Sequence, residues 1–269
     1  MSRPIRLAVQ INPQHAPYAA LREAAIEAEE RGADVVMNWD HFYPLSGDPV
    51  GMHFECWTNL ASFAEVTHRV ELGPLVVCNS YRNPNLLADM ARTVDHISNG
   101  RVILGIGAGW FEKDYAEYGY EFGTGPQRVA ALRRDLPIIK DRLQQLNPPP
   151  LRRMPILVGG GGEKVTLRIT ATHADIWHGF GDADQIRHKC AVLDAHCAKV
   201  GRDPAAIERS AGVPTQHRDD PGYGDGIVDA GATLLTFGIS GTNLDQAFLD
   251  RWVSWRDERN AEGRGTAGD

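Results

Sequence analysis

Apolar runs of strand length alternate with amphipathic helical segments along almost the whole chain, and this alternation constrains the fold more than any other feature. Residues 219–231, in the seventh unit, give only a weak helical pattern. The expected strands are residues 5–11, 33–40, 70–77, 101–107, 155–160, 174–180, 208–214 and 232–239. The expected helices are residues 17–31, 54–69, 84–98, 126–146, 163–173, 183–200 and about 243–260.

Strands that alternate with helices are parallel and are joined by right-handed crossovers. Eight such units in 269 residues predict an α/β fold, a (β/α)8 TIM barrel, with a doubly wound sheet as the alternative. Pro148–Pro150 reads as a stiff loop, because the alternation continues beyond it. We therefore expect a single domain over residues 1–269, with residues 110–125 as a long irregular loop and 261–269 as a frayed tail.

Composition narrows the function classes. The net charge of -7 argues against a role that depends on contacts to nucleic acid, which needs clustered basic charge. No segment reaches the length of a membrane span, and the N-terminus lacks a signal-peptide pattern. The four cysteines show no zinc-type spacing, as expected of reduced thiols. These features predict a cytoplasmic enzyme with a small-molecule substrate and no nucleic-acid or membrane partner.

The stretch RVILGIGAGWFEKDY places Gly105, Gly107 and Gly109 after an apolar run, which raises the possibility of a dinucleotide-binding turn. That turn needs the pattern G-x-G-x-x-G. In the two available registers its third glycine falls on Trp110 or Glu112, so neither completes it. In a barrel, glycines at the carboxyl end of a strand instead let the backbone approach a ligand that lies across the mouth.

A second glycine cluster, PILVGGGGEK, runs from an expected strand into an expected helix. It is not a Walker A loop, because Glu163 and Lys164 follow Gly162 where that loop needs lysine and then serine or threonine. Consecutive glycines before a helix can present backbone N–H groups to a phosphate, with Lys164 as a nearby counter-charge. The alternative interpretation is a tight turn without a ligand.

Asp40 and His41 lie at the carboxyl end of the second expected strand. Adjacent residues of an extended segment point to opposite sides, and the chain has no H-x-H or H-E-x-x-H pattern, so no metal site is predicted. A metal-dependent hydrolase remains an alternative. His41 fits better as a proton donor or acceptor beside a redox cofactor, because the pKa of an imidazole is easily tuned near neutrality.

These motifs together resemble the bacterial luciferase-like oxidoreductases, and in particular the branch that uses the deazaflavin coenzyme F420. The similar segments are VMNWDHF at 36–42, the run from Leu72 to Trp110, and ILVGGGGEKVTLRITATHADIW at 156–177. The resemblance implies a barrel with the deazaflavin ring in its mouth, Asp40 contacting the ring and His41 as the catalytic residue. It also implies a non-prolyl cis peptide at Leu75–Val76.

The residues expected to contact the cofactor besides Asp40 are Leu75, Val76, Cys78, Gly107, Ala108, Gly109, Gly160, Gly161, Gly162 and Lys164. The branch that oxidises a sugar phosphate has a glutamate where this chain has Trp110, so the resemblance argues against that substrate. An aromatic residue there predicts an apolar substrate pocket, formed by Trp39, Trp110, Phe111 and Trp177.

The sequence thus predicts an F420-dependent oxidoreductase that transfers a hydride between the deazaflavin and a small organic substrate. The closest alternative is the same fold with FMN, as a monooxygenase or a reductase, because FMN shares the tricyclic ring and the first phosphate. A noncatalytic cofactor-binding barrel is the alternative from another class. Family resemblance further implies a homodimer.

Overall fold

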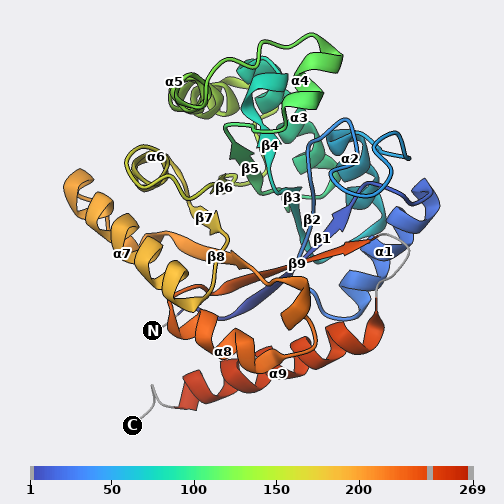
Figure 1. The fold of residues 1–269 in the computed structure, drawn as a ribbon, viewed down its shortest axis with the longest axis vertical. Helices are drawn as coiled ribbons and strands as arrows, with labels where there is room; N and C mark the ends of the chain where they lie inside the picture. Colours follow the sequence, from blue (N-terminus) through green and yellow to red (C-terminus); the bar gives the residue numbers. More distant parts are fainter. Residues whose placement is uncertain (1–2, 241–244, 266–269) are drawn as a thin grey trace.

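The computed structural model describes residues 3–240 and 245–265, and Figure 1 shows helices ranged around a central set of strands. The described residues form a nine-stranded parallel sheet in the order β3-β2-β1-β9-β8-β7-β6-β5-β4. The strands are β1 (Arg6–Asn12), β2 (Val35–Asn38), β3 (Glu71–Pro74), β4 (Val77–Cys78), β5 (Leu104–Gly107), β6 (Ile156–Gly159), β7 (Ile176–Gly179), β8 (Glu208–Gly212) and β9 (Leu234–Ser240).

The α-helices of the same residues alternate with these strands. They are α1 (Tyr18–Glu30), α2 (Cys56–Val66), α3 (Pro84–Ile97), α4 (Glu112–Tyr118), α5 (Gly125–Gln145), α6 (Thr166–His173), α7 (Ala183–Val200), α8 (Pro221–Asp229) and α9 (Gln246–Gly265). Short 3-10 helices are η1 (Asn79–Tyr81), η2 (Pro204–Ala206) and η3 (Thr215–His217).

The two end strands of the sheet belong to one expected strand, residues 70–77, which is interrupted between β3 and β4. A cis peptide bond joins Leu75 to Val76 at the interruption, as predicted. Leu72 forms a parallel bridge with Val102, just before β5, through hydrogen bonds of 2.9 Å from the Leu72 amide and 2.7 Å to its carbonyl. This bridge brings the ends of the sheet together, so the prediction of a (β/α)8 barrel is confirmed.

Local sequence signals explain where several helices begin and end. Asp182 and Gln185 form a reciprocal capping box at the start of α7, and Gly201 ends the helix with a φ of 67°. The weak seventh unit does form a helix, α8, which begins at Pro221. The last helix continues to Gly265, further than the tail expected from residue 261; residues 266–269 lie outside the described part of the chain.

The expectation of an irregular loop over residues 110–125 is wrong in its first half, where α4 forms. Acidic Glu112 and Asp114 in its first turn favour the helix through the dipole, and Gly119 ends it with a φ of 70°. Asp114 is fully buried and is held by partners far along the chain. Those tertiary contacts, which the local sequence does not display, stabilise this short helix.

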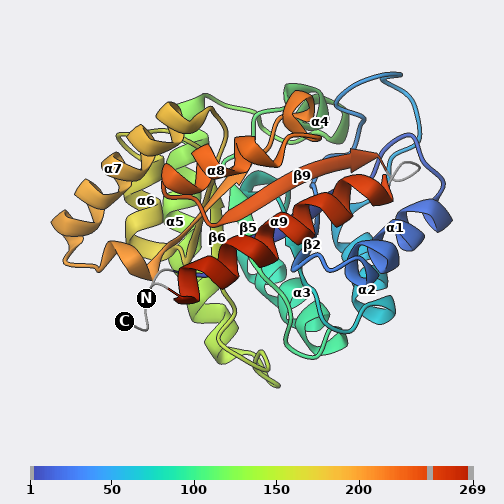
Figure 2. The same cartoon turned by 90° about the horizontal axis from the view of Figure 1, so that it is seen from below.

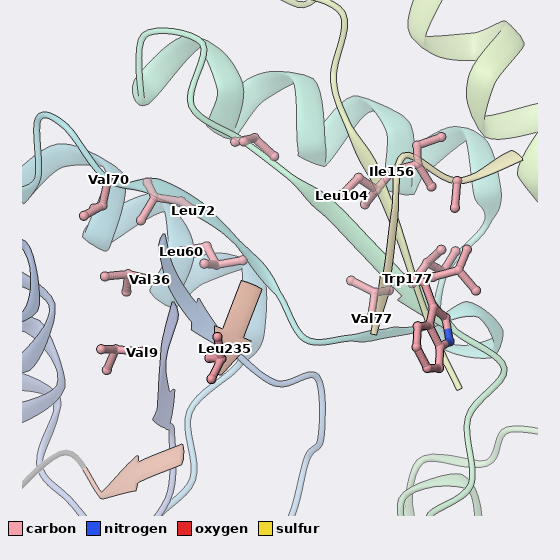
Figure 3. Close-up of a cluster of buried hydrophobic side chains, with 14 of the residues drawn as sticks. Val9, Val36, Leu60, Val70, Leu72, Val77, Leu104, Ile156, Trp177 and Leu235 are labelled. Atoms are coloured by element: carbon pink, nitrogen blue, oxygen red, sulfur yellow. The ribbon is translucent and has the colours of Figure 1, made fainter. Parts of the chain in front are cut away.

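Alternation along the strands divides the core into two layers. Side chains such as Val9, Leu72 and Leu235 point outward into the layer between sheet and helices, which Figure 3 shows in part. A smaller cluster, which includes Ala8 and Met37, fills the barrel interior. Figure 2 shows α9 running along the outside of the barrel near β9. None of the described helices is both long and apolar enough to cross a membrane.

Candidate active site

A cavity of about 610 Å³ opens where the carboxyl ends of β2, β5, β6 and β7 meet. This is the face at which barrel enzymes place their active sites, and the volume suits a cofactor-sized ligand. Eleven residues predicted from the sequence line it: Trp39, Asp40, His41, Leu75, Val76, Cys78, Gly107, Ala108, Gly109, Trp110 and Gly160. The sequence reasoning missed other lining residues: Gln10, Leu45, Val77, Gly159, Thr166, His178 and Phe180.

The break between β3 and β4 forms part of the cavity wall. Gln10, on β1, donates a 2.7 Å hydrogen bond from its side-chain amide to the Leu75 carbonyl and so fixes the chain there. Gly107 is needed for this arrangement, because a Cβ on it would lie 2.7 Å from a methyl of Val76. Gly107 therefore makes room for Val76, and both residues line the cavity.

His41 is held by a buried carboxylate. Its Nδ1 lies 2.7 Å from Oδ2 of Asp114, whose side chain is completely buried. The same Oδ2 accepts a 3.0 Å hydrogen bond from the Tyr81 hydroxyl, and Oδ1 accepts the backbone N–H groups of Phe42 and Tyr43, each at 3.2 Å. An imidazole fixed through Nδ1 in this way keeps Nε2 for the ligand, as histidine–carboxylate pairs in enzymes do.

Asp40 is part of a separate ion cluster. Arg82 binds it through two hydrogen bonds, of 2.6 and 3.0 Å, and the Cys78 amide donates a third, of 3.0 Å. Burial raises the pKa of Asp40, against the opposing effect of Arg82. Arg82 also reaches Glu55 at 2.6 Å. Besides lining the cavity, Asp40 therefore ties the end of β2 to β4.

Aromatic rings surround His41. Its ring centroid lies 5.7 Å from that of Trp110 and 5.4 Å from that of Phe111, both in edge-to-face arrangements. Trp39 lies 6.3 Å away on another side and donates its indole N–H to Nε2 of His53 at 3.1 Å. Burial lowers the pKa of His53 to about 4, so the ring is neutral and can accept that hydrogen bond. Three of the four predicted aromatic residues thus lie beside His41.

The fourth, Trp177, was predicted wrongly. Its side chain is fully buried in the layer outside the sheet, near Leu104 and Ile156 in Figure 3, and its indole N–H donates to the Gly160 carbonyl at 2.9 Å. Because side chains alternate along a strand, the next residue, His178, points inward and lines the cavity. The alternation of β7 is the signal that would have identified His178.

The glycines of the segment Gly159–Gly162 lie in different surroundings. Gly160, with a φ of 128° that favours glycine, lines the main cavity. Gly162 and Lys164 line an adjacent cavity of about 500 Å³, together with Arg133, which the sequence reasoning missed. Gly161 is exposed and lines neither cavity.

Thr166 lines both cavities and so connects the barrel mouth to the beginning of α6. The helix starts at this residue, three positions after the expected start at Glu163. The second cavity thus lies at the amino-terminal end of a helix, a place that favours an anionic group.

Comparison with known proteins places this site in context. The luciferase-like monooxygenase family model matches residues 1–222. An F420-dependent glucose-6-phosphate dehydrogenase of Amycolatopsis mediterranei is 37% identical over 125 residues, which are 45% of this chain and 36% of that relative. The chain thus matches well under two thirds of that relative's length.

Two solved structures show the same fold at low identity. An F420-dependent secondary alcohol dehydrogenase in complex with an F420-acetone adduct has a TM-score of 0.81 at 15% identity, covering 94% of this chain and 98% of that one. The coenzyme F420-dependent tetrahydromethanopterin reductase from Methanopyrus kandleri has a TM-score of 0.77 at 13% identity, covering 96% and 99%. At these identities the likeness concerns the fold.

Proposed function

The chain belongs to the luciferase-like monooxygenase family, and from this membership we propose that it is a coenzyme F420-dependent oxidoreductase. It transfers a hydride between the deazaflavin and a small organic substrate. The observation that carries the proposal is His41, which lies on the wall of a cavity at the barrel mouth and is paired behind that wall with the buried Asp114. F420-dependent enzymes among its relatives and structural neighbours support the choice of cofactor.

The cavity fits the cofactor in size and chemistry. The tricyclic ring would lie in the main cavity against Val76, with Ala108 and Gly109 along its edge. The phosphate would reach the adjacent cavity, where Gly162 offers backbone and Lys164 and Arg133 offer positive charge. When bound there, the deazaflavin supplies the hydride chemistry, and the protein supplies orientation and proton transfer.

His41 handles the proton. With Nδ1 facing Asp114, the neutral imidazole offers an unprotonated Nε2, which takes the proton of a substrate hydroxyl as the hydride leaves the adjacent carbon. The buried carboxylate of Asp114 stabilises the imidazolium that results. In the reverse direction the imidazolium returns the proton to the oxygen of a carbonyl. Trp39, Trp110 and Phe111 restrict access of water to this ring.

FMN is the second candidate cofactor, because it shares the ring system and the first phosphate with F420. Glucose 6-phosphate, the substrate named for the relative above, is a poor candidate here. Trp110 replaces the acid expected for it and is 63% exposed at the cavity mouth. A metal-dependent hydrolase has no support in the described residues, which contain no cluster of potential metal ligands.

Tryptophan fluorescence tests the cofactor directly, because Trp39 and Trp110 line the cavity. Titration with F420 should quench this fluorescence with a Kd well below about 1 mM, the weak end of the affinity scale, and FMN should bind less tightly. His41→Ala should then leave the Kd for F420 within about threefold while turnover falls at least a hundredfold. No quenching by either cofactor would refute the proposal, and unchanged turnover would remove His41 from its role.

We also propose that the enzyme works in the cytoplasm as a homodimer. Four buried free thiols, Cys56, Cys78, Cys190 and Cys197, support a reducing compartment. Light scattering coupled to size-exclusion chromatography tests the homodimer. A mass near 59 kDa, twice the 29.6 kDa of the chain, is expected, and the monomer mass would contradict the proposal.

A further inference from the structure

His178 is a buried polar side chain to which the proposed mechanism gives no role. It lies at the carboxyl end of β7, two residues after Ile176, which belongs to the cluster inside the barrel. Its side chain therefore points to the same interior side, where it lines the main cavity although only 2% of the residue is exposed.

The two ring nitrogens of His178 have different surroundings. Nδ1 lies 2.8 Å from the Ser210 hydroxyl on β8, and that hydroxyl lies 3.3 Å from the hydroxyl of Thr236 on β9. Nε2 is buried, and no hydrogen-bond partner reaches it from residues 3–240 or 245–265. Native proteins rarely leave a buried polar atom unpartnered, because its desolvation is then uncompensated. Because His178 lines the cavity and the Phe180 ring packs against it, a ligand that displaces this ring can supply the missing partner.

His178 is uncharged at neutral pH, since burial lowers its pKa to about 4. A neutral imidazole carries one donor and one acceptor, and the Ser210 hydroxyl can serve Nδ1 as either. If Nδ1 donates to Ser210, Nε2 accepts a hydrogen bond; if Ser210 donates to Nδ1, Nε2–H donates one. Because the proton of an alcohol hydroxyl goes to His41, the second arrangement is the one that fits: Nε2–H donates to the oxygen of an alcohol or of a carbonyl.

The rest of the cavity wall is uncharged or neutralised. Leu45, Trp39, Trp110 and Phe180 provide apolar surface, and the Phe180 ring stands edge-to-face to that of His178 at 4.9 Å. Among the described lining residues Asp40 is the one carboxylate, and Arg82 pairs with it. No lysine or arginine of the described chain lines this cavity, so it offers nothing to balance a substrate phosphate or carboxylate.

We propose that Nε2 of His178 is a substrate-binding atom that hydrogen-bonds the oxygen of an uncharged alcohol or carbonyl compound. This inference rests on the proposed function, which it extends to a substrate class. His41 exchanges the proton with that oxygen, whereas His178 orients the oxygen without changing charge. The Ser210 hydroxyl, which lies 3.3 Å from that of Thr236, donates to Nδ1, so Nε2–H donates to the oxygen of the alcohol and of the carbonyl alike, and no proton moves on His178.

The nitrogen resonances of His178 provide a test that does not depend on turnover. Protein labelled with 15N-histidine is titrated with 2-propanol, cyclohexanol, acetone and cyclohexanone, with and without F420. The expected result is a shift of the Nε2 resonance with these probes, in the direction of an N–H donor for alcohols and for ketones. His178→Gln, which removes the signal, assigns it. No shift with any probe, or the same shift with F420 alone, would overturn the inference.

Kinetics of the F420-loaded enzyme give a second test. For any probe that is turned over, His178→Phe should raise KM about tenfold while the Kd for F420 stays within twofold, and His178→Gln should recover part of the loss. A KM that His178→Phe leaves unchanged would overturn the inference. Failure of wild-type protein to bind F420 at all would instead refute the proposed function, and the resonance test without F420 would still decide the role of His178.

Discussion

Replacing Asp114 with asparagine tests whether this carboxylate takes part in catalysis through His41 or only stabilises the fold. The buried carboxylate accepts four hydrogen bonds, from His41, Tyr81 and the amides of Phe42 and Tyr43. Asparagine keeps the volume and one acceptor oxygen, which can still serve the two amides through the Oδ1 position. Its NH2 group, which is a donor, then takes the place of the oxygen that faces His41 and the Tyr81 hydroxyl. The two hydrogen bonds that these groups make to a charged carboxylate are therefore lost.

The expected losses of stability and of turnover both follow from these hydrogen bonds. Two hydrogen bonds to a charged partner contribute about 1.5–3 kcal/mol each, so the free energy of unfolding should fall by about 3–6 kcal/mol. The amide also favours the tautomer of His41 with a protonated Nε2, which cannot accept the substrate proton. Turnover should therefore fall by about 10²–10⁴. Asp114 does not line the cavity, so the Kd for F420 should change less than about threefold.

Asp135→Asn is the matched control. Asp135 is also a buried carboxylate, on α5, bound to Asn79 at 2.8 Å and to Arg134, and it lies outside the cavity wall. It should lose stability in urea denaturation but keep turnover within about twofold of the wild type. If Asp114→Asn keeps its turnover, or loses no more than Asp135→Asn, the His41–Asp114 pair has no part in proton transfer.

Three further predictions concern pH, the chain break and the phosphate site. Because burial lowers the pKa of His178 from 6.5 to about 4, its contribution to stability is complete above pH 6.5 and is lost as pH falls through 4; the loss is about 3 kcal/mol, measured by urea denaturation. Gly107→Ala would push its Cβ against Val76 and should raise the Kd for F420 about tenfold, measured by fluorescence. Lys164→Ala should raise that Kd roughly fivefold, less at high salt.

Each of these has a control. His178→Phe should reduce the fall in stability between pH 6.5 and 4 and leave the share of His53, whose pKa is also lowered to about 4; an unchanged slope would assign the whole effect to other groups. Gly226→Ala, where a Cβ would meet Ala183 at an ordinary 3.7 Å, should leave the Kd unchanged. Lys199→Ala is the control for Lys164→Ala, because Lys199 lies on the exposed end of α7, and it should leave the Kd for F420 unchanged. An effect of Lys164→Ala that does not weaken with salt would argue against a phosphate contact.

Much of the fold could be predicted because its signals are local. Each of the eight expected strands is present, one of them divided into β3 and β4, and the helix expected over residues 183–200 coincides with α7. Polar residues at strand ends identified His41 for the same reason: parallel strands bring their carboxyl ends to one face. The break between β3 and β4 could be placed through family resemblance alone.

The residues that complete the site could not be found locally. Asp114 meets His41 across 73 positions of sequence, in a helix that the local pattern does not predict. Arg82 reaches Asp40 across 42 positions, and neither distance is encoded in a motif. The wrong prediction for Trp177 has another cause, because the alternation of side chains along β7 is a local signal. That alternation places Trp177 on the outer side of the strand and His178 on the side of the cavity.

Parallel measurement of F420 and FMN reduction tests whether the enzyme transfers a hydride to F420 with the help of His41. Purified protein is mixed with either cofactor and a panel of uncharged alcohols, and the loss of the cofactor's visible absorbance is followed. We expect bleaching of F420 that needs both the alcohol and His41, with FMN reduced far more slowly. Reduction of FMN at an equal or higher rate, or F420 bleaching that His41→Ala leaves unchanged, would contradict this expectation.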